Sequence, residues 1–178
     1  MTNNDAIAEL NRLFPYVREY QQLAKKVANI NDIFQDNGGK LLQVLLVTGL
    51  RNLDKSREGN DAIDSNGNEY ELKSVNTQLT KSFSTNHHLN PSIINKYRKV
   101  DWVFAVYDDI ELIEIYLMKP HMLEFFYKKW ETQYNITGKD INNPKIPLSY
   151  VRENGILVFR HNENYTLSPA PINEPPKK

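Results

Sequence analysis

The stretch that decides the fold is DAIDSNGNEYELK, residues 61–73, in which apolar and polar residues alternate around Ser65-Asn66-Gly67. Alternation with a period of two is typical of a half-buried strand, and a glycine-containing break between two such runs favours a β-hairpin. Residues two apart in a strand lie on the same face, so Glu71 and Lys73 share one face of the second strand. The sequence therefore predicts a hairpin that carries a carboxylate and an amine side by side.

The length of the hairpin loop decides where Asp61 lies. A two-residue loop, Asn66-Gly67, would pair Asp61 with Leu72 and put its side chain on the face opposite Glu71. A three-residue loop pairs Asp61 with Glu71, and Gly67 then supplies the left-handed conformation that the third loop position needs. We therefore predict a three-residue loop, with the two carboxylates on one face.

Two neighbouring carboxylates repel each other, and a divalent cation with oxygen ligands relieves the repulsion. Mg²⁺ typically binds one or two carboxylates together with phosphate and water, so Asp61 and Glu71 are candidate ligands. Lys73 adds a positive charge that can meet a phosphate or help to deprotonate a water. The set suits hydrolysis of a phosphodiester by a metal-activated water. The same short pattern also occurs on solvated strand faces, and this structural alternative stays open.

The rest of the chain predicts an α/β (α+β) fold, a central mixed β-sheet flanked by helices. The continuous apolar run at residues 102–107 predicts a central strand, because a strand buried on both faces does not alternate. Further strands are predicted over 110–118 and 156–159, and helices over 90–98 and 120–134. Residues 135–149 are predicted as a polar loop. Residues 168–178 hold four of the nine prolines and are predicted as a flexible tail.

The N-terminal region predicts helices with an apolar stripe. Residues 5–13 and 15–28 are predicted as two helical pieces, with Pro15 in the first turn of the second. Their stripe faces either the body of the domain or a second subunit. A further helix is predicted to start near Gly39, with Asp36 or Asn37 as its cap. The stripe is formed by Leu10, Leu13, Val17, Tyr20, Leu23 and Val27.

Composition excludes several classes of protein. The 22 basic residues equal the 22 acidic ones, which argues against a purely electrostatic nucleic-acid or membrane-surface binder. The absence of cysteine excludes disulfide staples, zinc–thiolate sites and cysteine nucleophiles. No signal peptide and no apolar stretch of spanning length is recognised, so a cytoplasmic protein without membrane contact is expected.

Several blocks of the sequence resemble known nucleases. Asp61 followed by Glu71-Leu72-Lys73 resembles the PD-(D/E)xK nuclease motif, with Asn60 where that motif often has proline. Longer blocks resemble the PvuII family of type II restriction endonucleases, in the same order and across roughly residues 9–165. These blocks are residues 31–46, 57–62, 69–74, 83–85, 87–88 and 139–147.

This resemblance implies a Mg²⁺-dependent homodimer, with Mn²⁺ as a plausible substitute, that cuts double-stranded DNA at the palindrome CAGCTG and leaves blunt ends. It implies one endonuclease domain over residues 1–167, in which residues 1–30 mediate dimerisation and 31–167 form the catalytic and recognition core. Asp61 and Glu71 would be the metal ligands, Lys73 the catalytic lysine, and Tyr97 a neighbour of the hydrolytic water. The implied DNA contacts are Asp36, Ser84, His87, His88, Asn142, Asn143 and Lys145.

The implied contacts make chemical sense, although each has a simpler reading. An asparagine amide offers one donor and one acceptor, the pattern that pairs with adenine in the major groove, yet Asn142 and Asn143 also precede a proline as turn residues do. His87 and His88 read bases or are solvated loop residues. Nearby basic residues are predicted to contact phosphates, or else they are ordinary surface charges. These residues are Lys81, Lys96, Arg98, Lys139 and Lys145. Asn86 departs from the family, which has a third histidine there.

Two alternative functions remain. A repair or structure-specific nuclease with the same motif would cut without regard to a hexamer sequence. A non-catalytic DNA-binding protein of the same fold would bind without releasing product, although three intact charges at residues 61, 71 and 73 argue against a disused site.

Overall fold

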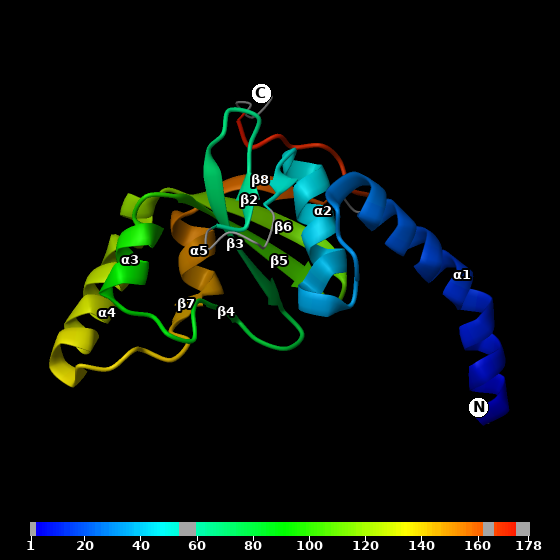
Figure 1. Ribbon diagram of the computed structural model, residues 1–178, viewed down its shortest axis with the longest axis horizontal. Helices are drawn as coiled ribbons and strands as arrows, with labels where there is room; N and C mark the ends of the chain where they lie inside the picture. The colour runs from blue at the N-terminus through cyan, green and yellow to red at the C-terminus, as the bar shows by residue number, and fades with distance from the viewer. Residues whose placement is uncertain (1–2, 54–59, 162–165, 174–178) are drawn as a thin grey trace. The chain divides into compact units, whose positions relative to one another are not determined.

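The computed structural model describes residues 3–53, 60–161 and 166–173 (Figure 1). The chain divides into two compact units, residues 1–43 and residues 44–178. Among the described residues, no helix is both long enough and apolar enough to cross a membrane. The two units are described in turn.

The first unit is dominated by one long helix, α1 (Asn3–Ala28). The prediction of two helical pieces separated at Pro15 is wrong, because the helix continues through this proline. A proline inside a helix removes one backbone donor, and a helix of 26 residues retains enough other hydrogen bonds to continue. Beyond α1 the chain turns back, and the Gln21 side chain accepts from the N–H of Ile33 (2.8 Å) and donates to the carbonyl of Ile30 (3.0 Å).

A short 3₁₀ turn, η1 (Gln35–Asn37), leads into α2 (Gly38–Thr48). The capping by Asp36 or Asn37 stays a prediction. Both residues adopt left-handed backbone angles (φ of 49° and 60°), whereas the cap of a helix usually has an extended conformation. The helix begins at Gly38. A side chain there would lie 2.4 Å from the carbonyl oxygen of Asp32, so the chain can turn this tightly only at a glycine.

The second unit is built on a mixed sheet of six strands in the order β1-β2-β3-β5-β6-β8, which confirms the predicted architecture (Figure 1). Only β3 and β5 are parallel, and every other neighbouring pair is antiparallel. The predicted strands over 110–118 and 156–159 are found as β6 and β8. The bounds are β1 (Arg51–Asn52), β2 (Ala62–Ile63), β3 (Glu69–Asn76), β5 (Asp101–Asp108), β6 (Glu111–Met118) and β8 (Ile156–Arg160).

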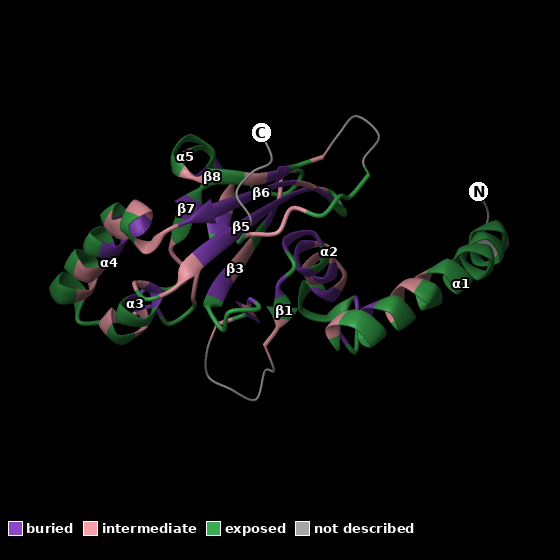
Figure 2. Cartoon of the chain, turned by 90° about the horizontal axis from the view of Figure 1, so that it is seen from above, coloured by how far each residue is buried: buried purple, intermediate pink, exposed green. Residues whose placement is uncertain are grey.

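The predicted central strand is confirmed as β5, which is buried along its length (Figure 2). Its side chains at 102, 104 and 106 belong to a large aromatic core that α3 (Pro91–Tyr97), α4 (Glu124–Thr137) and α5 (Leu148–Asn154) also line. The side chains at 103, 105 and 107 are buried on the opposite face. Burial on both faces explains why the run is apolar without interruption.

The helix predicted from Pro120 is confirmed as a 3₁₀ turn, η2 (Pro120–Leu123), followed by α4. The helix predicted over 90–98 is found as α3, and Asn90 caps it, since its side chain accepts from the N–H groups of Ser92 and Ile93. The prediction of a polar loop over 135–149 is wrong in its second half. That half forms a short strand, β7 (Lys145–Pro147), and the start of α5.

β7 pairs antiparallel with β4 (Ser82–Ser84) in a separate two-stranded sheet. Neither strand is evident from the sequence, because three residues are too few for a visible alternation. Their central residues, Phe83 and Ile146, are fully buried and face each other in the pairing. The small sheet thus fixes two otherwise polar segments onto the aromatic core.

The described part of the predicted tail makes regular contacts with the second unit. The N–H of Ala170 donates to the carbonyl of Val47 (2.7 Å), and the N–H of Ile172 donates to that of Thr48 (3.1 Å). The Asn173 side chain donates to Asp64 (2.7 Å). Residues 174–178 of the predicted tail lie outside the described residues.

Candidate functional site

Residues 61–73, here called the acidic hairpin, adopt the predicted three-residue loop. Two backbone hydrogen bonds of Asp64 close the loop. Its N–H donates to the carbonyl of Asn68 (3.0 Å), and its carbonyl accepts from the N–H of Gly67 (3.3 Å). Gly67 has a φ of 86°, the left-handed conformation expected of it. The strand pairs Ala62 with Tyr70. Asp61 lies in a bend just before β2, its N–H also donates to the carbonyl of Tyr70 (3.0 Å), and its carboxylate lies close enough to act on the charge of Glu71.

The carboxylate of Asp61 is held against the second strand of the acidic hairpin. The N–H of Leu72 donates to its Oδ2 at 2.8 Å. Asp61 itself is exposed, whereas Glu71 is only 7% exposed. A buried carboxylate therefore lies beside one that faces solvent.

Glu71 and Lys73 form an ion pair on an aromatic floor. The Nζ of Lys73 lies 2.6 Å from Oε1 of Glu71 and 5.8 Å from the ring centroid of Trp102. Strand β5 places Trp102 opposite Glu71 in the parallel pairing. A cation over an indole face in a partly dry environment is stabilised by the ring quadrupole. The ring therefore helps to hold the lysine ammonium in one place.

Tyr97 completes the cluster from the end of α3. Its side chain is hydrogen-bonded to Glu71, and its ring packs edge-to-face on Trp102 with the centroids 4.6 Å apart. Burial raises the pKa of the Tyr97 phenol, and the negative charge of Glu71 raises it further. The phenol is therefore protonated at neutral pH and acts as a hydrogen-bond donor rather than as a base.

The charges of the cluster act on one another through a low-dielectric environment. Burial raises the pKa of Glu71, the Lys73 ammonium opposes this shift, and the Asp61 carboxylate adds to it. When one carboxylate raises the pKa of its neighbour, nearby positive charge does not fully neutralise the two negative charges. Lys73 supplies part of the positive charge, and the remaining negative charge favours binding of a further cation.

The donor set fits a hard divalent cation. In the described part of the chain, no three acidic or histidine side chains gather closely enough to form a cage of protein ligands. The acidic hairpin offers two carboxylates, the number that Mg²⁺ commonly takes from a protein when phosphate and water complete its shell. Asp61 and Glu71 are thus the residues that would hold the ion.

A second feature brings together two segments that are far apart in the sequence, residues 82–90 and 139–147, here called the loop ribbon. Beside the β4–β7 pairing, Leu89 and Ile141 exchange both of their backbone hydrogen bonds (3.0 and 2.8 Å). Between these anchors, the N–H of Asn143 donates to the carbonyl of Asn86 (2.8 Å). The buried Leu89 and Ile141 face the core, so the polar residues around them point outward.

The loop ribbon gathers all the predicted DNA-contacting residues of the second unit. These are Ser84, His87, His88, Asn142, Asn143 and Lys145. Asp36 lies in the first unit.

The two histidines occupy a turn, and they have different neighbours. The Nδ1 of His87 lies 3.3 Å from the Oδ1 of Asn142, and the Nδ1 of His88 lies 4.0 Å from Asp140. Both imidazoles are exposed. The turn presents them side by side to solvent, next to the asparagines.

The amide of Asn143 is oriented by the ribbon itself. Its Oδ1 accepts from the N–H of Thr85 at 3.1 Å, and its backbone adopts a left-handed φ of 50° that asparagine tolerates. An amide oxygen has two lone pairs, so one acceptor position and both amide hydrogens stay available. Thr85 thus fixes which end of the amide is the acceptor.

The predicted phosphate-binding cations differ in their surroundings. Lys145 donates to Ser84 Oγ (2.6 Å) at the exposed edge of the ribbon, and Lys81 donates to the carbonyl of Thr77 (2.7 Å). Arg98 does not fit the prediction, because its guanidinium is shared between Glu124 and Glu131. It joins α3 to α4 instead of facing a ligand. The two carboxylates raise the pKa of Arg98 further.

Two contributing residues were missed in the sequence, because no local pattern marks them: Trp102 forms the floor of the acidic cluster, and Thr85 orients Asn143. Asn86, which the sequence marked only as a departure from the family, binds both the backbone of Asn143 and, through its Oδ1, the N–H of His88 (2.7 Å). Asn86 is also hydrogen-bonded to the Tyr97 side chain.

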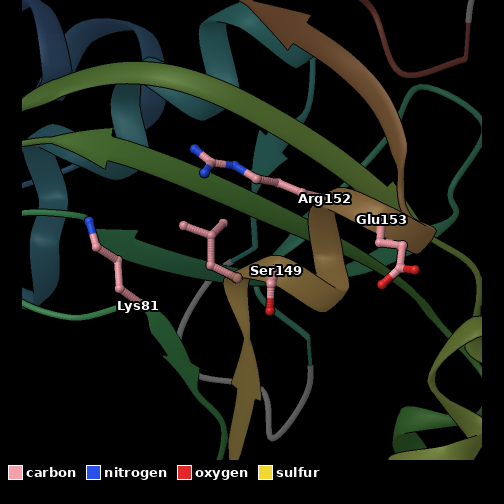
Figure 3. A pocket seen from close by; sticks show the side chains of 5 residues that line it. Lys81, Ser149, Arg152 and Glu153 are labelled. Atoms are coloured by element: carbon pink, nitrogen blue, oxygen red, sulfur yellow. The ribbon is translucent and has the colours of Figure 1, made fainter.

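A pocket beside α5 shares no lining residue with the acidic hairpin (Figure 3). It is lined by Lys81, Leu148, Ser149, Arg152 and Glu153. None of these is a residue of the acidic hairpin, and Arg152 is engaged by Glu114 (2.9 Å). The pocket therefore has no part in the chemistry of the carboxylates.

Comparison with known proteins agrees with the geometry. The family model described as restriction endonuclease PvuII matches residues 5–159. The match covers both the acidic hairpin and the loop ribbon, and it ends within β8.

Proposed function

Since this chain belongs to the restriction endonuclease PvuII family, whose members are site-specific deoxyribonucleases, we propose that it cuts both strands of the palindrome CAGCTG at the centre, with Mg²⁺ as cofactor, and leaves blunt ends. The target sequence and the end type come from the resemblance of the sequence blocks to that family. Mn²⁺ is the expected substitute for Mg²⁺, because both accept carboxylate and phosphate oxygens.

One observation carries the proposal. The Asp61 carboxylate lies against the strand that carries Glu71, since it accepts from the N–H of Leu72 (2.8 Å), and the Lys73 ammonium lies 2.6 Å from Glu71. The bound cation would supply positive charge for the phosphate and activate the attacking water. Lys73 would hold a proton-transferring or charge-stabilising position beside the scissile phosphate, because Glu71 and Trp102 restrict its movement.

Tyr97 would act through its hydrogen bond. Its raised pKa keeps the phenol protonated, so it donates to Glu71 and fixes the rotamer of that carboxylate. The metal ligand is then preorganised before DNA arrives. Tyr97 thus has a positioning role rather than a basic one.

The loop ribbon would read the bases. Asn143 offers an oriented acceptor and donor, which matches the N6 and N7 groups of adenine in the major groove. The exposed imidazoles of His87 and His88 can donate to guanine O6 or N7. Ser84, Asn142 and Lys145 would supply neighbouring polar and phosphate contacts, and Asp36 would approach the minor groove.

Two copies would form the working enzyme, since one acidic cluster cuts one strand and a palindrome has two-fold symmetry. Helix α1 carries exposed apolar side chains along much of its length, including Leu10, Leu13, Leu23 and Val27. An exposed apolar helix face is typical of a protein–protein contact. We assign α1 to the dimer contact.

The dimer contact is tested by sedimentation. Leu13→Asp should shift the protein from dimer to monomer and reduce double-strand cleavage, whereas Gln22→Asp, on the opposite face of the helix, should leave the dimer intact. An unchanged dimer in Leu13→Asp would remove α1 from the interface.

The cleavage activity is tested by end mapping. The purified protein with Mg²⁺ should linearise a plasmid that carries a single CAGCTG and produce blunt ends between G and C. A plasmid with one base pair of the site exchanged is the control and should stay circular. Chelation of the metal should stop the reaction, and Mn²⁺ should restore it. An intact cognate plasmid over a range of salt and pH, or cuts at unrelated sequences, would refute the proposal.

A further inference from the structure

The C-terminal segment contacts the end of α2 through backbone groups. The carbonyls of Val47 and Thr48 belong to the last turn of α2, where no N–H of the helix can reach them. The N–H groups of Ala170 and Ile172 supply the missing donors, at 2.7 and 3.1 Å. Gly49, with φ of 71°, lets the chain leave the helix at that point.

The spacing of prolines in this segment suits an extended strap. In extended chain, the N–H groups of alternate residues point to the same side, so Ala170 and Ile172 both face α2. Pro169 and Pro171 occupy the alternate positions, where the loss of an N–H removes no bond to α2. Prolines also restrict the free chain, which lowers the entropy lost when the strap binds.

The strap ends at a buried carboxylate of the acidic hairpin. Asp64, which is 2% exposed, accepts from the Nδ2 of Asn173 (2.7 Å), and the hydroxyl of Tyr70 lies within hydrogen-bond distance of both Asp64 Oδ2 (3.0 Å) and Asn173 Oδ1 (3.2 Å). The other donors to Asp64 come from residues 66 and 68 of the hairpin loop. Among the described residues, Asn173 is the donor to the Asp64 carboxylate that comes from outside the hairpin, and Arg51 of β1 donates to the backbone carbonyl of Asp64 (3.4 Å).

Asp64 has a direct structural link to the candidate metal ligand Asp61. The two residues flank β2, which consists of only two residues, and its neighbour β1 is equally short. Strands this short have few ladder bonds of their own, so the position of β2 depends on what holds its ends. Asp64 is held by the loop, by Asn173 and, through its backbone carbonyl, by Arg51, and Asp61 lies at the other end of β2, beside Glu71.

We propose that Asn173 is a positioning residue for the nuclease site: residues 168–173, here called the strap, tie the C-terminal segment to Asp64 and thereby hold Asp61 beside Glu71. The family match ends at residue 159, so the strap lies outside it. The consequence for cleavage rests on the proposed function, whereas the consequence for the hairpin does not.

The first test measures backbone hydrogen exchange in the full-length protein without DNA or metal. Asn173→Ala should speed exchange of the hairpin amides of Asn66 and Asn68 about tenfold, the factor for one hydrogen bond to a charged group. Ser168→Ala, an exposed position in the same segment, is the matched control and should leave exchange unchanged. Equal exchange in Asn173→Ala and wild type would overturn the proposal, whatever the protein does to DNA.

The second test separates positioning from general stability. At saturating DNA, Asn173→Ala should raise the Mg²⁺ concentration for half-maximal cleavage several-fold, with a smaller change in the rate at saturating Mg²⁺. Ser168→Ala is again the matched control and should leave both the Mg²⁺ dependence and the rate unchanged. A uniformly lower rate with an unchanged Mg²⁺ dependence would contradict the positioning role. If wild-type protein cuts no DNA, the proposed function fails, and the exchange experiment alone still decides the strap.

Discussion

The acidic hairpin and the loop ribbon hold their polar side chains in different environments. In the hairpin, Glu71 is 7% exposed and is paired with Lys73 over an aromatic ring. In the ribbon, the histidines and Asn142 are exposed, and the N–H of Thr85 orients the Asn143 amide from the other segment. Catalysis needs charges that are poorly solvated, whereas base recognition needs donors and acceptors that are held in place and still face outward.

Of the substitutions considered, a change at Lys73 should reduce activity the most. Lys73→Ala should lower the cleavage rate by about 10²–10⁴, the usual contribution of a group that assists proton transfer, and should leave specific DNA binding intact. Single-turnover cleavage and a binding titration without Mg²⁺ measure the two effects separately. Lys129→Ala, which removes an exposed lysine of α4, is the control. Unchanged cleavage in Lys73→Ala would remove this lysine from the chemistry.

The ribbon should show the opposite pattern. Asn143→Ala removes the oriented amide and should cut discrimination between A·T and other base pairs at one position by about 1–3 kcal/mol, the value of a good bidentate contact. The rate on cognate DNA at saturating enzyme should fall much less. Cleavage of cognate and single-mismatch duplexes gives the ratio, and Asn135→Ala on the exposed face of α4 is the matched control. If both ratios are equal, Asn143 does not read the base.

Acid stability sharpens the difference, because only the hairpin holds a strongly stabilised buried carboxylate. Burial alone would raise the pKa of Asp64, but the hydrogen bonds from Asn68, Asn173 and Tyr70 outweigh it and hold the pKa well below its usual value. A lowered folded-state pKa contributes stability above the unfolded pKa of about 3.9, and this contribution is lost as the pH falls below that value.

Asp64→Asn should therefore cost about 1–3 kcal/mol at pH 7, the range for a hydrogen-bonded charge, and the gap to wild type should narrow at pH 3. Urea unfolding at both pH values measures it, with the exposed Glu153→Gln as the control. A gap that does not change with pH would show that the carboxylate of Asp64 is not the source of the stability.

A substitution at the exposed edge of the loop ribbon should change DNA affinity the least. Lys145→Ala should weaken DNA binding only a few-fold, equally for cognate and unrelated sequences, because a phosphate contact carries no sequence information. The slope of log K against log salt should fall by about 0.9, the value for one lost contact. Titration at three salt concentrations gives the slope. A loss confined to the cognate site would instead make Lys145 a reader of bases.

The sequence by itself determined the acidic hairpin and the central strand. Alternation, a glycine in the loop and the spacing of Glu71 and Lys73 are local properties, so the register of Asp61 could be worked out within 13 residues. The apolar run of β5 was equally plain, because burial on both faces leaves no polar position. Pro15 was misjudged, since a long helix tolerates a single missing donor.

Only the tertiary structure decided what surrounds these elements. It placed Trp102 under Lys73, set Thr85 against Asn143 across 58 residues of sequence, and joined Asn173 to Asp64 across 109. Such contacts depend on which short strands pair and which helix ends lack donors, and these are settled by burial of distant side chains rather than by any local pattern. A short segment of sequence therefore specifies the reactive residues, whereas contacts between distant segments of the folded chain fix their positions.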